Sequence, residues 1–149
     1  MNERLRCHIT VAAVIERGGR FLLVEEPIDR RRVWNQPAGH LEARETVIDA
    51  IVREVREETG YRFEPSGWLG ATTLALPSGA VSLRIAFTGT VGATPESDPE
   101  PPITAVGWLT RTEIDSLEVR SPLTTAAIDA FFVAPRLPLT ALAHFDAQS

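Results

Sequence analysis

Hydrophobic and polar residues alternate over the first part of the chain, as they do in a half-buried β-strand. Between residues 7 and 16, the apolar side chains that share one face are Ile9, Val11, Ala13 and Ile15. The dipeptide Gly18-Gly19 is a hairpin signal, and the run RFLLVEE then predicts a second strand over 20–26. Two consecutive antiparallel strands are therefore expected at the start of the fold.

The next stretch, residues 27–42, has no sustained alternation and carries the three arginines of the segment 30–32. We expect a loop there, with a short strand around Trp34 as an alternative. The arginines are interpreted as part of a solvated loop surface, with phosphate contacts as a weaker alternative.

The apolar period changes after Thr46, which predicts an amphipathic helix. Apolar residues recur at i, i+3, i+4 and i+7, at Ile48, Ile51, Val52 and Val55. The Thr46 hydroxyl can cap the first turn, and Asp49 supplies the reciprocal acid of a capping box. Gly60 stands at the position where a left-handed glycine commonly ends a helix.

Downstream, the alternation resumes and then gives way to turn and helix signals. The expected elements are strands over 68–76 and 80–91, an acidic proline-rich loop over 92–102, a strand over 103–109, and helices starting near 110–112 and at 121–122. The last fifteen residues are ambiguous. The order predicts an α/β fold in which a mixed sheet carries helices on both faces, and we interpret residues 1–149 as one domain.

Composition limits the classes of partner. A formal net charge of −5 argues against general nucleic-acid binding, which needs a basic surface. The N-terminal run turns polar too soon for a secretory signal, and no apolar stretch reaches membrane-spanning length, so we expect a cytoplasmic protein that binds neither nucleic acid nor membrane. The single cysteine, Cys7, excludes a disulfide framework and is expected to be a buried, inert thiol.

Three glutamates, Glu54, Glu57 and Glu58, lie at i, i+3 and i+4 on the expected helix. Like charges at this spacing are mildly destabilising, and here they form a band beside the apolar stripe, at the edge of the core. A hard divalent cation such as Mg²⁺ prefers oxygen ligands of this kind and would remove the repulsion. The alternative is a solvated charged face on which Arg53 and Arg56 form local ion pairs.

The spacing of the surrounding residues favours the metal interpretation. The stretch fits Gly-x5-Glu-x7-Arg-Glu-aliphatic-x-Glu-Glu-x-Gly, with the positions filled by Gly39, Glu45, Arg53, Glu54, Val55, Glu57, Glu58 and Gly60. Seven specified residue types would coincide by chance in a chain this long about once in a million. The pattern, over 39–61, resembles the signature of the Nudix hydrolases. Tyr61 departs from it, because the family usually has an aliphatic residue at this packing position.

This resemblance implies an α/β/α sandwich with a loop–helix–loop catalytic motif. It also implies metal-dependent hydrolysis of a diphosphate linked to another group, with Mg²⁺ as cofactor and Mn²⁺ as a substitute. By position, Glu54, Glu57 and Glu58 resemble the metal ligands, and Glu54 is the leading candidate for the general base. No covalent intermediate is required, because water activated at the metal is the nucleophile.

Three further motif positions carry supporting roles in the resemblance. Arg53 resembles the arginine that orients the carboxylates. Glu45 resembles the glutamate at the start of the helix that supports the metal site, directly or through water. Gly39 marks a close approach of the backbone, with its carbonyl facing the metal.

Flanking segments narrow the resemblance within the family. Pro-Ala-Gly stands before the motif where many members have Pro-Gly-Gly, and together with SLRIAF and VRSPL it resembles the bacterial NudJ-type phosphatases, most strongly at 33–61 and 119–123. Those proteins act on nucleoside tri- and diphosphates and on the pyrophosphates of thiamine and hydroxymethylpyrimidine, generally releasing orthophosphate. The same reaction is implied here, with a small-molecule substrate. A monomer or weak homodimer is expected.

Two alternatives stay open from the sequence. One is a Nudix pyrophosphatase of ADP-ribose or another nucleoside diphosphate derivative. The other is a Nudix-fold sensor that binds its ligand without cleaving it, which the complete acidic set disfavours.

Substrate contacts are expected outside the acidic helix. Arg84, on the polar face of a central strand, is a candidate to bind a phosphate bidentately, with an exposed strand arginine as the alternative. Arg120 is a weaker candidate of the same kind. His40 either touches a phosphate or is a plain loop histidine, and Trp34 either stacks on a substrate ring or packs in the core.

The acidic loop offers one more possibility. Glu96, Asp98 or Glu100 is a candidate for a further metal ligand, and the alternative is that this loop is only solvated.

Overall fold

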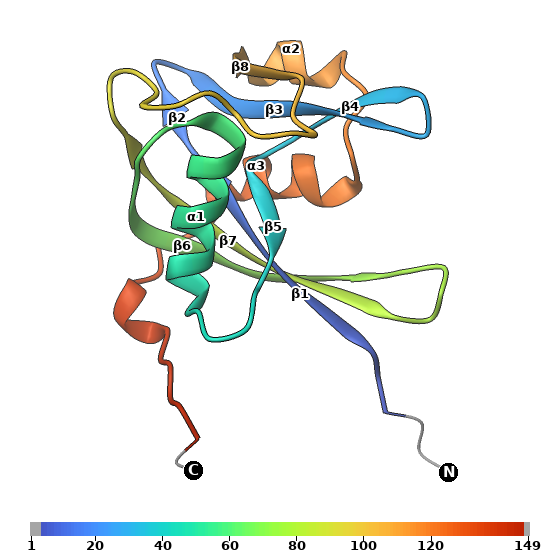
Figure 1. The fold of residues 1–149 in the computed structure, drawn as a ribbon, viewed down its shortest axis with the longest axis vertical. Helices are drawn as coiled ribbons and strands as arrows, with labels where there is room; N and C mark the ends of the chain where they lie inside the picture. Colours follow the sequence, from blue (N-terminus) through green and yellow to red (C-terminus); the bar gives the residue numbers. More distant parts are fainter. Residues whose placement is uncertain (1–3, 148–149) are drawn as a thin grey trace.

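The computed structural model describes residues 4–147, and two four-stranded sheets form its centre (Figure 1). The first sheet is mixed and has the order β5-β1-β7-β6. Its strands are β1 (Cys7–Val14), β5 (Ala38–His40), β6 (Phe63–Ala75) and β7 (Val81–Val91). Strands β1 and β7 pair in parallel, and the other pairs of this sheet are antiparallel.

The second sheet is antiparallel throughout. Strand β3 lies at its centre. Strand β8 pairs along one edge of β3, and β2 and β4 pair with the two ends of the opposite edge. The strands are β2 (Glu16–Arg17), β3 (Arg20–Ile28), β4 (Arg31–Asn35) and β8 (Ala105–Thr110). The predicted hairpin at Gly18-Gly19 is confirmed, since β2 and β3 pair directly across it.

The prediction of a loop over 27–42 is wrong in part. Strand β3 runs on to Ile28, β4 contains the alternative short strand around Trp34, and β5 adds a third. Strand β4 is held by pairing with β3, and β5 is held by pairing with β1. The partner of β5 is distant in the sequence, and both strands are very short. A local hydrophobic pattern therefore cannot reveal them.

Strand β6 also begins earlier than predicted, at Phe63 instead of Trp68. It contains Pro65, Gly67 and Gly70, which are unusual inside a strand. The strand lies at an edge of the sheet, and its register shifts at Pro65/Gly67 and at Trp68/Gly70. Edge position and bulges allow these residues to remain within the pairing.

The helices follow their predicted signals. Helix α1 (Val47–Thr59) begins after Thr46, whose capping box with Asp49 is present, and ends at Gly60 with φ 74°. Helix α2 (Arg111–Asp115) is capped by Thr110, and α3 (Pro122–Val133) is capped by Ser121. In the ambiguous C-terminal region, a short 3-10 helix, η1 (Leu139–Ala141), forms, and Leu137 makes an isolated β-bridge to Trp68.

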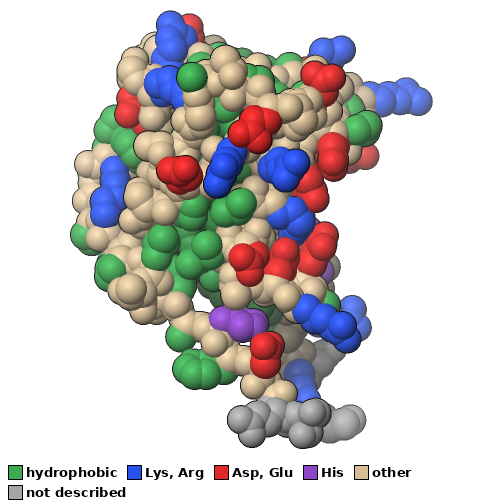
Figure 2. Space-filling view, turned by 60° about the vertical axis from the view of Figure 1, so that its left-hand side comes forward, with side chains coloured by type: hydrophobic (Ala, Val, Ile, Leu, Met, Phe, Trp, Pro, Cys, Tyr) green, Lys and Arg blue, Asp and Glu red, His purple; other side chains and the backbone are tan. Residues whose placement is uncertain are grey.

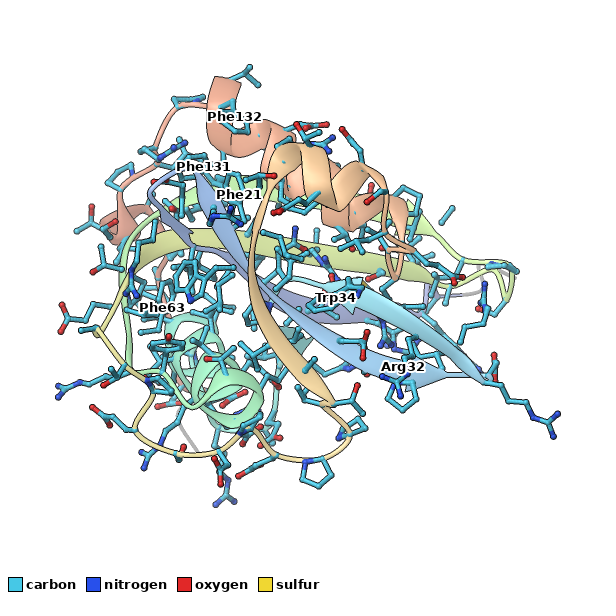
Figure 3. The ribbon with its side chains drawn as sticks, turned by 90° about the horizontal axis from the view of Figure 1, so that it is seen from above. Phe21, Arg32, Trp34, Phe63, Phe131 and Phe132 are labelled. Carbon is cyan, nitrogen blue, oxygen red and sulfur yellow. The ribbon has the colours of Figure 1, made fainter. Side chains whose placement is uncertain are left out.

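Helices cover the mixed sheet on both faces, so the predicted α/β/α sandwich is confirmed (Figure 1). Val11 and Ala13 of β1 pack on the α1 side with Ile51 and Val55, whereas Val14 packs on the α3 side. Figure 3 shows the α3 side, where Phe131 and Phe132 lie against Phe21 with ring centroids 5.3 and 5.6 Å away.

The expectation of a buried Cys7 is wrong, since the thiol is exposed. The first half of β1 extends beyond the helices together with the β6–β7 hairpin, so neither face is covered there (Figure 1). No helix in residues 4–147 is long and apolar enough to cross a membrane.

Candidate active site

Helix α1 places its three acidic side chains at different depths. The apolar stripe fixes the rotation of the helix, with Ile51 and Val55 fully buried. That rotation leaves Glu54 only 9% exposed, whereas Glu57 and Glu58 lie partly open to solvent. Figure 2 shows acidic side chains and arginines gathered along one side of the molecule. The band of carboxylates is therefore at the edge of the core, and Arg53 forms local ion pairs within it, as the solvated-face alternative also expects.

Arg53 binds several of these carboxylates at once. Its Nη1 lies 2.7 Å from Glu54 Oε1 and 3.3 Å from Glu57 Oε2, and its Nη2 lies 2.7 Å from Glu45 Oε1. Nη2 also donates to the His40 carbonyl at 3.1 Å. The hydrogen bond from Arg53 lowers the pKa of Glu45, so this carboxylate is held ionised. One guanidinium thus joins the acidic helix to the loop before it.

Glu54 meets the backbone of Gly39. A Cβ atom built on Gly39 would stand 2.1 Å from the Glu54 carboxyl carbon, well inside van der Waals contact. The predicted close approach of the backbone at Gly39 is therefore present. Burial raises the pKa of Glu54, and Arg53 opposes the shift.

Glu58 faces the same strand from one turn further along α1. The Ala38 backbone N–H donates to its Oε2 at 2.9 Å. Burial nevertheless raises the pKa of Glu58 to about 8, with smaller contributions from the charges of Glu54 and Glu26. Two neighbouring carboxylates that both resist ionisation indicate a site that favours an added positive charge.

A cavity of about 340 Å³ opens over these groups. Its wall includes Gly39, His40, Glu54, Glu58, Arg84 and Arg120. A smaller depression of about 130 Å³ lies on the other side of the acidic band and is lined by Glu54, Glu57, Glu58 and Glu100. The fold thus brings most of the predicted site residues to one cavity.

The predicted substrate arginines differ in their surroundings. Arg84 is 8% exposed, so the alternative of an exposed strand arginine is wrong. Arg120 forms an ion pair with Glu26 at the cavity wall. Arg31 and Arg32 pair with Glu118 and Glu25 on the exposed surface of the β3–β4 hairpin, away from the cavity.

The two aromatic candidates also differ in whether they line the cavity. His40 lines the cavity, and its ring lies 6.0 Å from that of His8 in an edge-to-face arrangement. Trp34 does not line the cavity. Its ring packs beside Gly107 and the core on the α3 side, among the strands of the second sheet (Figure 3). The packing alternative therefore describes Trp34.

The acidic loop is docked on α1 by its backbone. The Glu96 N–H donates to the Gly60 carbonyl at 2.8 Å, and the Glu100 N–H donates to the Glu57 carbonyl at 2.7 Å. Glu100 shares the small depression with the three helix glutamates, whereas Asp98 lines a different one beside Arg53. The backbone of the loop is thus held against α1, while the side chains of Glu96, Asp98 and Glu100 are exposed, as the alternative of a solvated loop expects.

The donor set fits a hard divalent cation. Within residues 4–147, no three acidic, histidine or cysteine side chains converge closely enough to form a ready-made cage. Glu54 is paired with Arg53, and Glu58 accepts a hydrogen bond from the Ala38 N–H. The available ligands are carboxylate oxygens whose burial opposes ionisation, and a cation would offset that cost.

Comparison with known proteins decides the family. The NUDIX domain family matches residues 6–129. The chain is a Nudix hydrolase.

Two relatives resemble this Nudix hydrolase over nearly its full length. Phosphatase NudJ of Escherichia coli K12 is 36% identical over 141 residues, which cover 93% of this chain and 92% of the relative. A NUDIX hydrolase from Nitrosomonas europaea is 37% identical, with a TM-score of 0.89 over 96% of this chain and 100% of that one. The expected likeness to NudJ is thus confirmed.

A more distant structure shows the fold alone. The NUDIX domain of Shewanella oneidensis NrtR, complexed with ADP ribose, has a TM-score of 0.69 at 12% identity and covers 87% of this chain and 88% of that one. The backbone arrangement is shared at that distance, whereas the site residues need not be.

Sequence reasoning missed several polar residues of this Nudix hydrolase that lie at the cavity or just behind it. Asn35 and Gln36 are almost fully buried although they precede the motif in a segment expected to be a loop. Glu26 and Thr124 come from β3 and α3. An Asn-Gln pair directly before the motif was a visible signal, whereas nothing local marks Glu26 or Thr124.

The contact between Gly39 and Glu54 predicts the effect of a single methyl group. Gly39→Ala should lower kcat by about 10- to 100-fold, because the new Cβ displaces the Glu54 carboxylate by an ångström or more. Stability should change little, since the obstructing atoms are the end of a flexible side chain. Steady-state kinetics and thermal melting measure both quantities.

Gly92→Ala is the matched control, because a Cβ there meets nothing closer than the Thr94 carbonyl at 3.7 Å. Equal activity of the two alanine variants would show that the Gly39 contact does not position Glu54.

Proposed function

We propose that this Nudix hydrolase cleaves the phosphoanhydride bonds of nucleoside tri- and diphosphates and of small pyrophosphates such as thiamine pyrophosphate, and that it releases orthophosphate. The proposed cofactor is Mg²⁺, with Mn²⁺ as a substitute. The observation that carries the proposal is one cavity with Glu54 and Glu58 on its wall together with Arg84 and Arg120. Carboxylates suit a cation and arginines suit phosphate oxygens, so the two halves of a metal–phosphate substrate have partners side by side.

Each acidic or basic side chain of the site has its own proposed role. When bound, the metal ion supplies charge neutralisation at the phosphate oxygens and lowers the pKa of the attacking water. Glu54 is the proposed proton acceptor, because it lies in the cavity and burial brings its pKa closer to neutrality. Arg53 holds Glu54, Glu57 and Glu45 in fixed positions, which keeps three like charges together before the substrate arrives. Glu57 and Glu58 are the other proposed metal ligands, with Glu45 in support.

The size of the cavity supports small substrates. A volume of about 340 Å³ is at the low end for small-molecule sites. It suits terminal phosphates and a single ring better than a nucleoside diphosphate sugar such as ADP-ribose. The identity to NudJ over most of the chain supports the same class of substrate.

The products provide the test. With Mg²⁺ and a nucleoside triphosphate in ¹⁸O-water, the proposal predicts orthophosphate carrying the label and a diphosphate that is then cut to the monophosphate. The pocket decides which phosphorus lies in line with the water, so a site that holds terminal phosphates should also discriminate weakly among bases. Mass analysis of both products, with thiamine pyrophosphate as a second substrate, gives the result.

Two outcomes would contradict the proposal in different ways. Pyrophosphate as the main product from a triphosphate would refute the proposed release of orthophosphate. Cleavage of ADP-ribose with no turnover of tri- or diphosphates would favour a pyrophosphatase of nucleoside diphosphate derivatives.

A further inference from the structure

Arg84 is a charged side chain buried in the middle of the mixed sheet. It lies on β7, where Thr10 of β1 and Thr72 of β6 are its cross-strand neighbours. Its side chain is 8% exposed and contributes to the wall of the cavity that contains Glu54 and Glu58. A buried cation of this kind normally has a carboxylate partner, because desolvation is costly.

The partners of Arg84 are neutral amides. Its Nη1 donates to Gln36 Oε1 at 3.3 Å and to Asn35 Oδ1 at 3.5 Å. Among the buried side-chain nitrogen and oxygen atoms of residues 4–147, Nε of Arg84 is the one without a hydrogen-bond partner. Within the same residues, no carboxylate forms an ion pair with it; the charge of Glu58 acts on it only through space. Its charge is therefore largely uncompensated.

The amides themselves are fixed by helix α3. The Thr124 hydroxyl donates to Asn35 Oδ1 at 2.9 Å, and the Gln36 amide donates to the Thr124 carbonyl. Thr124 is fully buried in the first turn of α3. The two amides, held by Thr124, orient the guanidinium of Arg84 without neutralising its charge. A protein prepares a binding group for an anion in this way.

A second arginine reaches the same cavity. The Arg120 backbone N–H donates to the Trp34 carbonyl at 2.9 Å, which fixes the start of its side chain. Its guanidinium pairs with Glu26, and its charge, together with burial as the larger cause, lowers the pKa of Arg84 to about 10. Two guanidinium groups that repel each other across one cavity have a common use, namely to bind the oxygens of one anion.

We propose that Arg84 and Arg120 form an oxyanion subsite that holds the terminal phosphate group of the substrate, with Arg84 as a specificity-determining residue. The inference rests on the proposed function, because it states which phosphorus of the substrate is attacked in that reaction. Arg84 holds the terminal group deep in the cavity, and Arg120 exchanges its ion pair with Glu26 for the phosphate. The phosphorus next to Glu54 and Glu58 is then the terminal one, so orthophosphate leaves.

The first measurement is binding of inorganic phosphate in EDTA, which needs no turnover. Phosphate should raise the melting temperature of the wild-type protein, and Arg84→Gln and Arg120→Gln should each weaken its binding at least about tenfold. Arg31→Gln is the control matched to Arg120→Gln, since it also removes one arginine of a surface ion pair but lies on β4, outside the cavity. Its phosphate binding should equal that of the wild type.

The second measurement is turnover with Mg²⁺. Arg84→Lys keeps the charge but loses the forked geometry, so KM for a triphosphate should rise at least about tenfold while kcat falls less. Arg84→Gln should also release a measurable share of pyrophosphate, because the register is no longer fixed. A merely structural Arg84 would lower the melting temperature and kcat without changing the product ratio. If the Arg84 variants do not fold, Arg120→Gln still tests the subsite, because the side chain of Arg120 is 43% exposed.

The outcomes separate this inference from the proposed function. If the wild type releases orthophosphate but the arginine variants retain its phosphate affinity, KM and product ratio, the subsite is wrong and the proposed function stands. If the wild type hydrolyses none of the substrates while phosphate binding depends on Arg84 and Arg120, the subsite stands and the proposed function is wrong.

Discussion

Glu54→Gln should lower kcat by more than about 10²-fold while leaving the fold intact. Glutamine has nearly the same size, so it can occupy the space beside Gly39 and still accept a hydrogen bond from Arg53. It cannot accept a proton from water, and it brings no negative charge to a cation. The loss should therefore appear in kcat for every substrate, with an unchanged circular dichroism spectrum and a similar melting temperature.

Glu58→Gln should show a similar loss with a different effect on stability. Because burial raises the pKa of Glu58 to about 8, the carboxyl is largely protonated near neutral pH in the metal-free protein. A neutral amide resembles that form, so the metal-free variant should be at least as stable as the wild type. Glu64→Gln, at an exposed position of β6, is the control and should keep full activity. Near-normal turnover of Glu54→Gln would show that another group is the base.

Removal of divalent metal should abolish activity altogether. EDTA should reduce hydrolysis to background, and an excess of Mg²⁺ or Mn²⁺ should restore it, because the available ligands are oxygens that suit hard cations. Phosphate release in dialysed protein, before and after metal addition, is the measurement. Full activity in chelator would exclude the metal-dependent reaction.

The metal requirement should also depend on pH, in a direction set by the buried carboxylates. Burial raises the pKa of Glu54, and it raises the pKa of Glu58 to about 8, so protons compete with the cation for Glu58 below about pH 8. The Mg²⁺ concentration for half-maximal activity should therefore fall as the pH rises from 6 to 8.5. A requirement that stays constant over this range would show that neither carboxylate must lose a proton when metal binds.

Helix α1 illustrates how much of the site could be predicted from local sequence. Its start at Thr46, its end at Gly60 and the rotation that brings Glu54 to the core edge all depend on residues within one or two turns. The ion pair of Arg53 with Glu57, four residues further on, follows from the same short range. These features could be predicted because side chains three or four residues apart on a helix must be neighbours.

The surroundings of Arg84 illustrate what could not. Strand alternation placed it on the polar face of β7, but that pattern is the same whether the face meets solvent or another layer. Its burial depends on Asn35 and Gln36, 49 and 48 residues away, and on the first turn of α3 behind them. Long-range contact of this kind leaves no periodic signal in the chain.

The same physical difference accounts for the other corrections. The short strands β4 and β5, the exposure of Cys7 and the packing of Trp34 each depend on which segment lies opposite, and that is decided only when the sheets assemble. By itself, the sequence determined the acidic helix, the spacing of its glutamates and the family to which the chain belongs. Tertiary structure alone decided that Arg84 of β7 and Arg120, which lies just before α3, share a cavity with those glutamates. Helix caps and residue spacing act within a few residues, whereas burial and charge pairing depend on the whole fold.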